Sequence, residues 1–185
     1  PDLRFGMELT TITETAATSD ARVFQAVASS GGSIRGFVAK GCGNYGRRQT
    51  DNLTEFAKSS GAQGLVFIAL DESADSIDAL EDDHIKSPLK KFLSLDVIKK
   101  IATEMGAEPG DLLLIVAGTE KLVNTVLSNL RNEMAKRLEL VDPKELAFAW
   151  VYDFPLFEWD EDLKKYEPAH HVFSSPKPEH MEYLD

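Results

Sequence analysis

The chain has 185 residues, of which 43% are hydrophobic and 28% are charged, and its 20 basic and 31 acidic residues give a formal net charge of −11. This length and composition predict one or two globular domains with a buried core and exclude a disordered tail. The single cysteine excludes an intramolecular disulfide framework, and no stretch approaches the ~20 apolar residues of a membrane-spanning helix. The acidic excess argues against nucleic-acid binding through the whole surface.

The first segment, residues 1–18, is polar and rich in threonine, without a clear amphipathic period. We expect it to be a connector that enters from elsewhere. The chain starts at Pro1 with neither an initiator methionine nor an apolar signal core, so we expect a piece of a longer protein. Because a lone thiol fits a reducing compartment, we expect that protein to be cytoplasmic.

The second segment, residues 19–140, alternates strand-like and helix-like patterns. Val23–Phe24 and Ser33–Lys40 are predicted to pair as a β-hairpin around Gly31–Gly32. The following elements are, in chain order, a helix over Thr50–Ser59 that ends at Gly61, a buried strand over Leu65–Leu70, an acidic loop over Asp71–Asp83, a helix capped by Ser94 and ended by Gly106, a strand over Leu112–Ala117 and a helix over Leu122–Leu138. This order predicts an α+β fold, with a mixed or antiparallel sheet and its helices on one face.

The third segment, residues 141–185, is aromatic. Ala147–Tyr152 is rich in aromatic and β-branched residues and is predicted to be a strand, and after the polar turn Asp160–Lys165 a second strand is predicted over Tyr166–Ser175. An isolated hairpin is marginally stable in water, so we expect the rest of this sheet to lie outside the chain.

The glycine pattern Gly41–Gly46 matches G-x-G-x-x-G, follows a predicted strand and precedes a predicted helix, with Asp71 further on as a candidate ribose ligand. These features leave open a dinucleotide-binding loop. Against it, the preceding strand is predicted to belong to a hairpin rather than to a parallel crossover unit. The favoured interpretation is a turn that needs positive φ or close backbone packing.

Other candidate groups have a structural interpretation that we favour over the functional one. Arg47–Arg48 could contact a phosphate or RNA, but adjacent arginines on an acidic domain are typical of a solvated helix entrance. Cys42 could be a reactive thiol beside these charges, but a bystander thiol is favoured. The seven acidic residues of Asp71–Asp83 lack the glycine and ligand spacing of a calcium loop, so no metal site is predicted.

The pair His170–His171 stands on a predicted strand of the aromatic segment. Neighbouring strand residues face opposite ways, so one imidazole can enter a site while the other packs behind it. This alternation argues against both rings binding one metal ion, and the residues alone favour a structural role.

Several stretches together resemble bacterial-type aspartyl-tRNA synthetases. The resemblance is carried by Pro1–Leu9, Trp150–Glu158 and His170–Lys177, while Leu53–Lys58, Gly61–Leu65 and Lys91–Ser94 resemble the GAD domain that is inserted in the catalytic domain of that family. The implied organisation is a connector at 1–18, a GAD insertion domain at 19–140 and a partial class II catalytic segment at 141–185, which contributes strands of the catalytic sheet.

The resemblance implies an aspartate–tRNA ligase that activates L-aspartate with ATP, assisted by Mg²⁺, and transfers it to tRNA. It implies that His170 contacts the substrate aspartate and that His171 supports the pocket, and it places no catalytic or metal-binding residue in this chain. Val172 stands where the family commonly has proline. The longer enzyme is expected to be a homodimer without membrane contact, and this piece is expected to be an inactive monomer that binds no cofactor.

Two alternatives belong to other functional classes. The chain could be an interaction module that contacts tRNA, for which Arg47 and Arg48 are the first residues to test. It could also be a nucleotide-binding domain that uses Gly41–Gly46, which predicts saturable binding of NAD or a relative.

Overall fold

The computed structural model describes residues 2–142, 144–150, 155–160, 162–169 and 177–183. The chain divides into two compact units, Pro1–Leu146 and Ala147–Asp185. In the first unit the elements are β1 (Thr10–Thr11), α1 (Thr13–Ala17), α2 (Arg22–Ser29), β2 (Ser33–Ala39), α3 (Arg47–Ser59), β3 (Val66–Leu70), η1 (Asp82–His84), β4 (Ile85–Lys86), η2 (Lys90–Phe92), α4 (Leu95–Glu104), β5 (Leu112–Gly118) and α5 (Glu120–Arg137). No helix in these described ranges is long and apolar enough to cross a bilayer.

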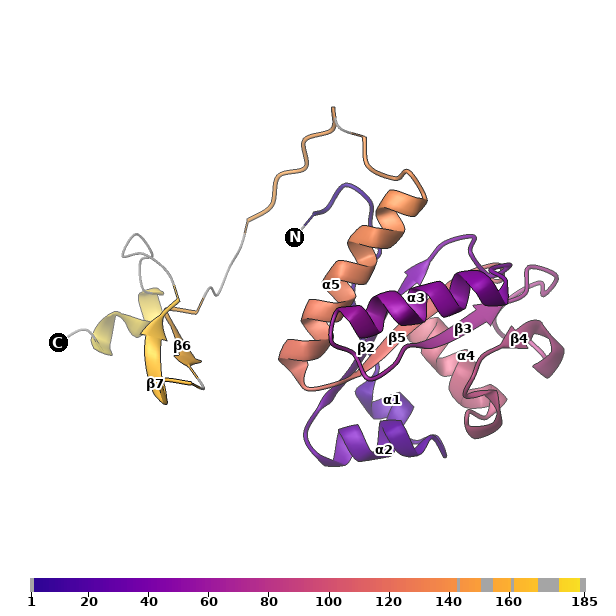
Figure 1. Ribbon diagram of the computed structural model, residues 1–185, viewed down its shortest axis with the longest axis horizontal. Coiled ribbons are helices and arrows are strands. Elements are labelled where there is room, and N and C mark those ends of the chain that lie inside the picture. The colour runs from indigo at the N-terminus through magenta and orange to yellow at the C-terminus, as the bar shows by residue number, and fades with distance from the viewer. Residues whose placement is uncertain (1, 143, 151–154, 161, 170–176, 184–185) are drawn as a thin grey trace. The chain divides into compact units, whose positions relative to one another are not determined.

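Within the described part of the first unit, five strands form one sheet in the order β1-β2-β5-β3-β4 (Figure 1). Every neighbouring pair is antiparallel. The central strand β5 pairs with β2 over its whole length, from Leu112 opposite Ala39 to Gly118 opposite Ser33, and with β3 from Leu112 to Ile115. The predicted α+β class with an antiparallel sheet is therefore confirmed.

Helices cover both faces of this sheet, and the prediction that they gather on one face is wrong. Alternate residues of β5 enter two separate cores: Leu113 and Ile115 face one, and Leu112, Leu114 and Val116 face the other. The first core is closed by α1, α2 and α4, and the second by α3 and α5. A strand that is apolar at every position needs cover on both sides, and the run Leu112–Val116 carried this signal in the sequence.

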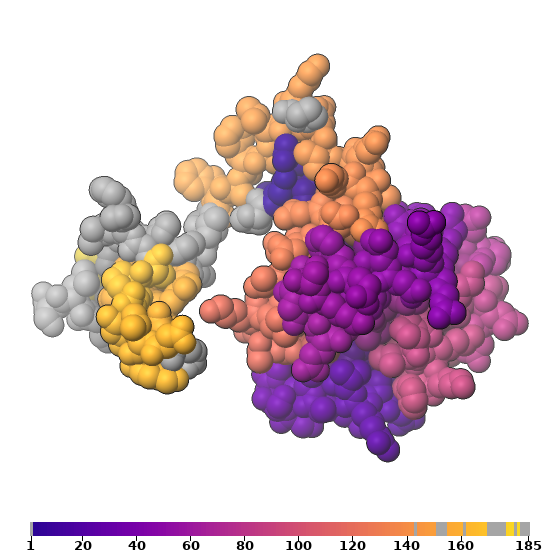
Figure 2. Space-filling model, viewed as in Figure 1, coloured from indigo at the N-terminus to yellow at the C-terminus, as the bar shows by residue number. Residues whose placement is uncertain are grey.

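The last helix of the unit lies beside α3 on its face of the sheet, as Figures 1 and 2 show in orange and purple. The Arg137 side chain of α5 donates to Asn52 Oδ1 of α3 at 2.8 Å. Four predicted elements are confirmed here: the helix before Gly61, the strands β3 and β5, and the long helix that became α5. The Ser94 cap of α4 is also confirmed, because its Oγ accepts from the Val97 amide at 3.3 Å.

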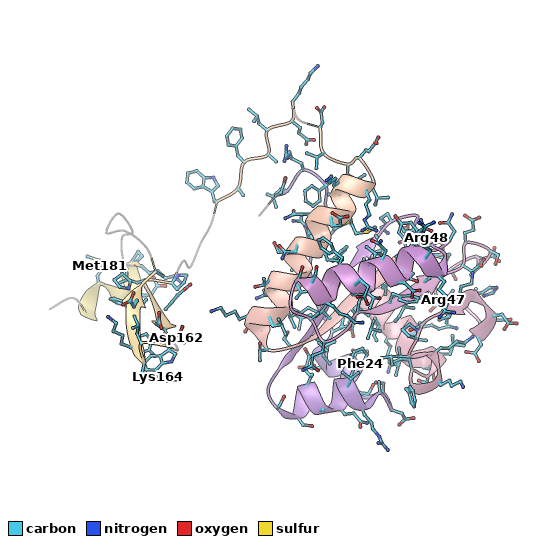
Figure 3. The ribbon with its side chains drawn as sticks, viewed as in Figure 1. Phe24, Arg47, Arg48, Asp162, Lys164 and Met181 are labelled. Carbon is cyan, nitrogen blue, oxygen red and sulfur yellow. The ribbon has the colours of Figure 1, made fainter. Side chains whose placement is uncertain are left out.

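The predicted strand at Val23–Phe24 is wrong, because both residues lie in α2. The side chain of Phe24, labelled in Figure 3, is fully buried in the first core, and Val27, one turn later, packs against the same core. Three-residue spacing of apolar contacts is helical, and this burial overrode the β propensity of the Val-Phe pair. The partners of β2 are β1 and β5 instead of a preceding hairpin strand.

Residues 10–17, within the predicted connector, form β1 and α1. Ile12 and Ala16 are buried in the first core, and the Ile12 amide donates to the Ile34 carbonyl at 3.0 Å. This part of the N-terminal segment thus belongs to the fold of the first unit, β1 as an edge strand of the sheet and α1 as a helix over the first core.

The second unit contains a hairpin of β6 (Phe157–Asp160) and β7 (Lys165–Pro168), followed by η3 (Pro178–Tyr183). The predicted polar turn is confirmed, since Asp160 Oδ1 accepts from the amides of Asp162 and Leu163, both at 2.8 Å. The predicted strand at Ala147–Tyr152 is wrong over its described part, because residues 147–150 form no strand. No other described strand pairs with this stretch, so its β propensity has no ladder to join.

Candidate functional site

The two residues that the resemblance assigned to the aspartate substrate, His170 and His171, lie outside the described residues. The nearest described backbone is the end of the β6–β7 hairpin, where the Ala169 amide donates to the Leu156 carbonyl at 2.9 Å. Within the hairpin, the rings of Trp159 and Tyr166 meet edge to face at a centroid distance of 5.2 Å. The substrate role of both histidines remains a prediction.

The glycine loop between β2 and α3 serves close backbone packing. The Gly43 amide donates to the Gly110 carbonyl at 2.7 Å, and a Cβ on Gly43 would overlap the Leu70 carbonyl oxygen. Gly41 has φ +68°, which L side chains rarely adopt. Since β2 and β3 are separated in the sheet by β5, the loop does not open a direct parallel crossover. These observations support the structural interpretation of the glycine pattern.

A buried carboxylate, Asp111, holds this loop against the turn before β5. Its two oxygens accept from the amides of Gly41 and Glu108, both at 2.9 Å, and one lies 3.0 Å from Lys40 Nζ. Burial opposes the charge of Lys40, but its contacts with Asp111 and Glu108 outweigh burial and raise the Lys40 pKa. These contacts give the buried Asp111 carboxylate a structural role. The sequence analysis did not identify this residue.

The adjacent arginines Arg47 and Arg48 begin α3, and both are exposed (Figure 3). The Arg47 side chain is 95% exposed, and its Nε lies 3.6 Å from Asp51 Oδ2. A solvated pair of this kind contributes little stability. The two guanidinium groups therefore stand at the surface, as the predicted helix entrance requires.

The thiol of Cys42 is 2% exposed and sits in the second core. Burial raises its pKa, which lowers the fraction of reactive thiolate. The bystander interpretation is therefore supported over a reactive thiol.

The acidic loop after β3 is organised by its own residues. The Asp71 carboxylate accepts from the Oγ and the amide of Ser73, at 2.6 and 2.9 Å, and these bonds lower the Asp71 pKa. In the described part of the chain, no three His, Cys, Asp or Glu side chains converge as a metal site would require.

An apolar hollow of about 690 Å³ opens between α2, the loop before β3, and the start of α5. Its walls include Val23, Val27, Leu65, Leu89 and Leu122. Of the described residues that line the hollow, one, Glu120, has a titratable side chain. The hollow therefore suits apolar contact rather than acid–base chemistry.

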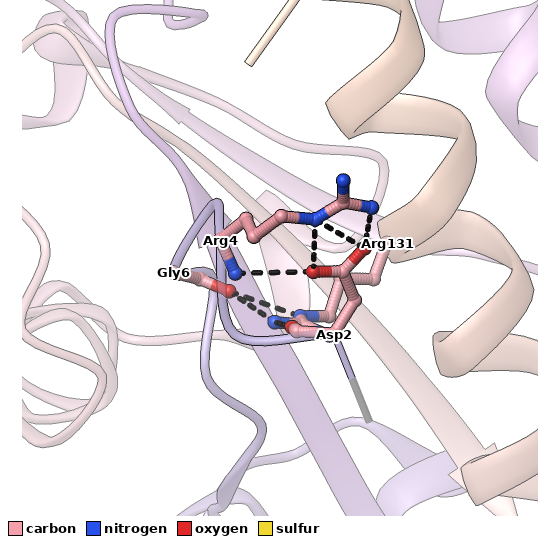
Figure 4. A network of polar contacts seen from close by, with 4 residues as sticks. All are labelled: Asp2, Arg4, Gly6 and Arg131. Carbon is pink, nitrogen blue, oxygen red and sulfur yellow. Dashed lines mark hydrogen bonds and ion pairs between the residues drawn. The ribbon is translucent and has the colours of Figure 1, made fainter. Parts of the chain in front are cut away.

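An arginine network, which sequence inspection missed, ties the N-terminal segment to α5 (Figure 4). Arg131 Nε donates to the carbonyls of Gly6 at 3.0 Å and Met7 at 2.9 Å. Its Nη2 donates to the carbonyls of Asp2 at 2.5 Å and Gly6 at 2.6 Å. The guanidinium carbon also stands 4.3 Å from the centre of the Phe5 ring.

Comparison with known proteins gives one family and a set of close relatives. The model of the GAD domain matches residues 24–127. Over all 185 residues the chain is 48% identical to the Aspartate--tRNA(Asp/Asn) ligase of Dehalococcoides mccartyi strain BAV1, 44% to that of Thermoanaerobacter sp. strain X514 and 42% to that of Desulfotalea psychrophila strain LSv54. The chain spans 31%, 30% and 29% of the length of these relatives, respectively.

Proposed function

We propose that this chain, which belongs to the GAD domain family, is one part of a longer aspartate–tRNA ligase. The observation that carries the proposal is the similarity to relatives of that name, which extends beyond the family match into residues 1–23 and 128–185. The insertion domain and the segments on both sides of it thus match in one continuous alignment.

The aromatic segment supports the same proposal. Leu146, Phe148 and Trp150 are 79%, 89% and 87% exposed, respectively. Alternate residues of a strand share one face, so in a strand completed by a partner these three side chains would pack together against a sheet. Large apolar groups gain free energy when they leave water, which favours a partner surface in the longer protein.

The proposed reaction has two steps. A carboxylate oxygen of L-aspartate attacks the α-phosphorus of ATP, forming aspartyl-adenylate and releasing pyrophosphate, and Mg²⁺ compensates the phosphate charge. A ribose hydroxyl at the tRNA 3′ end then attacks the acyl carbon and releases AMP. The names of the relatives extend the proposal to both the aspartate and the asparagine tRNA. We further propose a homodimeric, cytoplasmic enzyme.

In this proposal His170 contacts the substrate aspartate and His171 supports the pocket. Imidazole N–H groups donate well to a carboxylate, and a protonated ring adds charge to the bond. In the longer enzyme, His170→Ala is expected to raise the aspartate concentration needed for half-maximal exchange, with a smaller effect from His171→Ala. An unchanged aspartate requirement in His170→Ala would remove the proposed contact.

The test of the whole proposal is aspartate-dependent ATP–pyrophosphate exchange, followed by aspartylation of tRNA(Asp) and tRNA(Asn) transcripts. The longer protein and this chain are assayed side by side. We expect the longer protein to catalyse the exchange and this chain alone to show no exchange. Absence of exchange with both proteins would overturn the ligase proposal.

A second candidate function is contact with tRNA by the first unit, which the exposed guanidiniums of Arg47 and Arg48 favour. The test measures tRNA binding by the full 185-residue chain and by an Arg47→Gln/Arg48→Gln variant. Lys91→Gln/Lys100→Gln removes the same charge from two other exposed positions and is the matched control. Equal binding by both variants would exclude a specific contact at the start of α3.

A further inference from the structure

The N-terminal strap, residues 2–8, makes a turn that is unusual for its sequence. Gly6 and Met7 have φ +61° and +54°, so two successive residues are in the left-handed region. Glycine adopts it freely, but in Met7 the Cβ lies close to the following carbonyl oxygen, which raises the free energy of the turn. Contacts outside the strap must therefore stabilise it.

The Arg131 side chain supplies the polar contacts, and Met7 also packs against the second core. Its four hydrogen bonds reach three carbonyls, those of Asp2, Gly6 and Met7. An extended strap would spread residues 2 and 7 about 17 Å apart, so one guanidinium could not reach both. Only the turned strap presents its carbonyls to the planar fork of donors. The turn and the arginine contacts therefore form and break together.

The strap also forms one wall of a second hollow, of about 810 Å³. Phe5 and Met7 line one side of this hollow, and Leu138 and Leu140, which follow α5, line another. The strap and the segment that follows α5 thus share one surface. Release of the strap would change that surface and the direction in which the backbone before Phe5 leaves the unit.

We propose that Arg131 is a latch that holds the N-terminal strap in a closed state, distinct from an open state in which the rest of the unit stays folded. The closed latch fixes the direction of residues 2–4 relative to α5. The strap adds no strand to the sheet, because β1 begins at Thr10 and Ile12 is held by its own bond to Ile34, and its apolar contact with the rest of the unit is the packing of Met7 against the second core. This inference concerns the chain itself and does not rest on the ligase proposal.

The experiment compares Arg131→Gln with Arg137→Gln in the full 185-residue chain. Both arginines lie on α5, but Arg137 bonds to Glu133 and Asn52 and not to the strap. One readout is the methyl NMR signal of Met7, with Ile98, which is 1% exposed in the first core, as the internal reference. The other is the rate at which trypsin cleaves after Arg4, measured by intact mass.

Loss of four charge-assisted bonds is expected to raise cleavage after Arg4 at least about tenfold in Arg131→Gln and to move the Met7 signal toward that of an unfolded peptide. The Ile98 signal of the first core should stay as in the unsubstituted chain. Arg137→Gln should cleave after Arg4 within about twofold of the unsubstituted chain, because the strap keeps its bonds. Arg131→Lys should fall between, since an ammonium lacks the fork.

A second pair of variants tests the latch from the strap side. A Cβ on Gly6 meets nothing within 4 Å, so Gly6→Ala acts through its positive φ alone and should also open the strap. Gly64→Ala, where a Cβ also meets nothing within 4 Å and φ is not positive, is the control. Unchanged cleavage in both Arg131→Gln and Gly6→Ala overturns the proposal. A shift of the Ile98 signal toward its unfolded position together with the Met7 signal also overturns it, because Arg131 would then support the whole fold.

Discussion

The Gly43 amide and the Gly110 carbonyl are joined at 2.7 Å across two turns that lie 67 positions apart in the chain. A Cβ on Gly43 would stand 2.8 Å from that carbonyl and would overlap the Leu70 oxygen. Backbone cannot move aside as a side-chain tip can. We therefore expect Gly43→Ala to lower the free energy of unfolding by about 2–3 kcal/mol, measured by denaturant unfolding.

The control for this prediction comes from the same glycine pattern. A Cβ on Gly46 would meet Gln49 Oε1 at 3.8 Å, an ordinary contact, so Gly46→Ala should cost under about 1 kcal/mol. Equal losses in the two variants would contradict the packing argument. Saturable NAD binding by the unsubstituted chain, lost in Gly46→Ala, would instead favour the nucleotide-binding alternative.

The cap of α4 gives a second prediction. Ser94 Oγ accepts from the Val97 amide, whereas Thr119, the N-cap of α5, makes no such side-chain bond. Ser94→Ala should therefore cost about 1 kcal/mol of unfolding free energy, and Thr119→Ala clearly less. Denaturant midpoints of the two variants provide the measurement, and a larger loss in Thr119→Ala would contradict it.

The buried Cys42 thiol gives a third prediction. Because burial raises its pKa, the native chain at pH 8 should react with a thiol-specific disulfide reagent at least about tenfold more slowly than the chain in denaturant. The reaction is followed by absorbance, with free cysteine as the reference. Native reactivity equal to that of free cysteine would restore the reactive-thiol hypothesis.

The Asp2 carboxylate gives a pH prediction. The side-chain bonds from Arg4, and then the Arg4 amide, lower the pKa of Asp2 from 3.8 to about 2. A lowered native pKa means that the stabilising contact is complete above pH 3.8 and is lost as the pH falls through about 2. An NMR titration of the Asp2 carboxyl should have its midpoint near 2, and Arg4→Gln should move it toward 3.8. An unmoved midpoint in that variant would contradict the assigned cause.

The elements that could be predicted from the sequence are those whose pattern is strong and local. The run at Leu112–Ala117 indicated a buried strand, and the apolar stripe after Leu122 indicated the long helix α5. The strand predicted at Val23–Phe24 failed because helix packing of Phe24 outweighed a two-residue β propensity. Ala147–Trp150 has a strand-like composition, but strand formation also requires a partner, which composition alone cannot indicate.

The candidate sites also differ in how far the sequence alone could identify them. The pattern at Gly41–Gly46 could be interpreted as a turn from its glycines alone, but its contact with Gly110 depends on the tertiary fold. The contacts of Arg131 could not be predicted from the sequence, because its partners are backbone carbonyls, which every residue type carries. The roles of His170 and His171 came only from family resemblance, and both lie outside the described residues.

The central strand of the sheet is the last of its described strands to be synthesised. Before β5 emerges, β2 can pair only with the two-residue strand β1, and β3 only with the two-residue strand β4. Neither pair is long enough to persist in water. During translation the first unit should therefore stay unfolded until Gly118 has left the ribosome, and its second core should close only after α5 has also emerged. Ribosome-bound chains that end before Leu112 should remain protease-sensitive throughout.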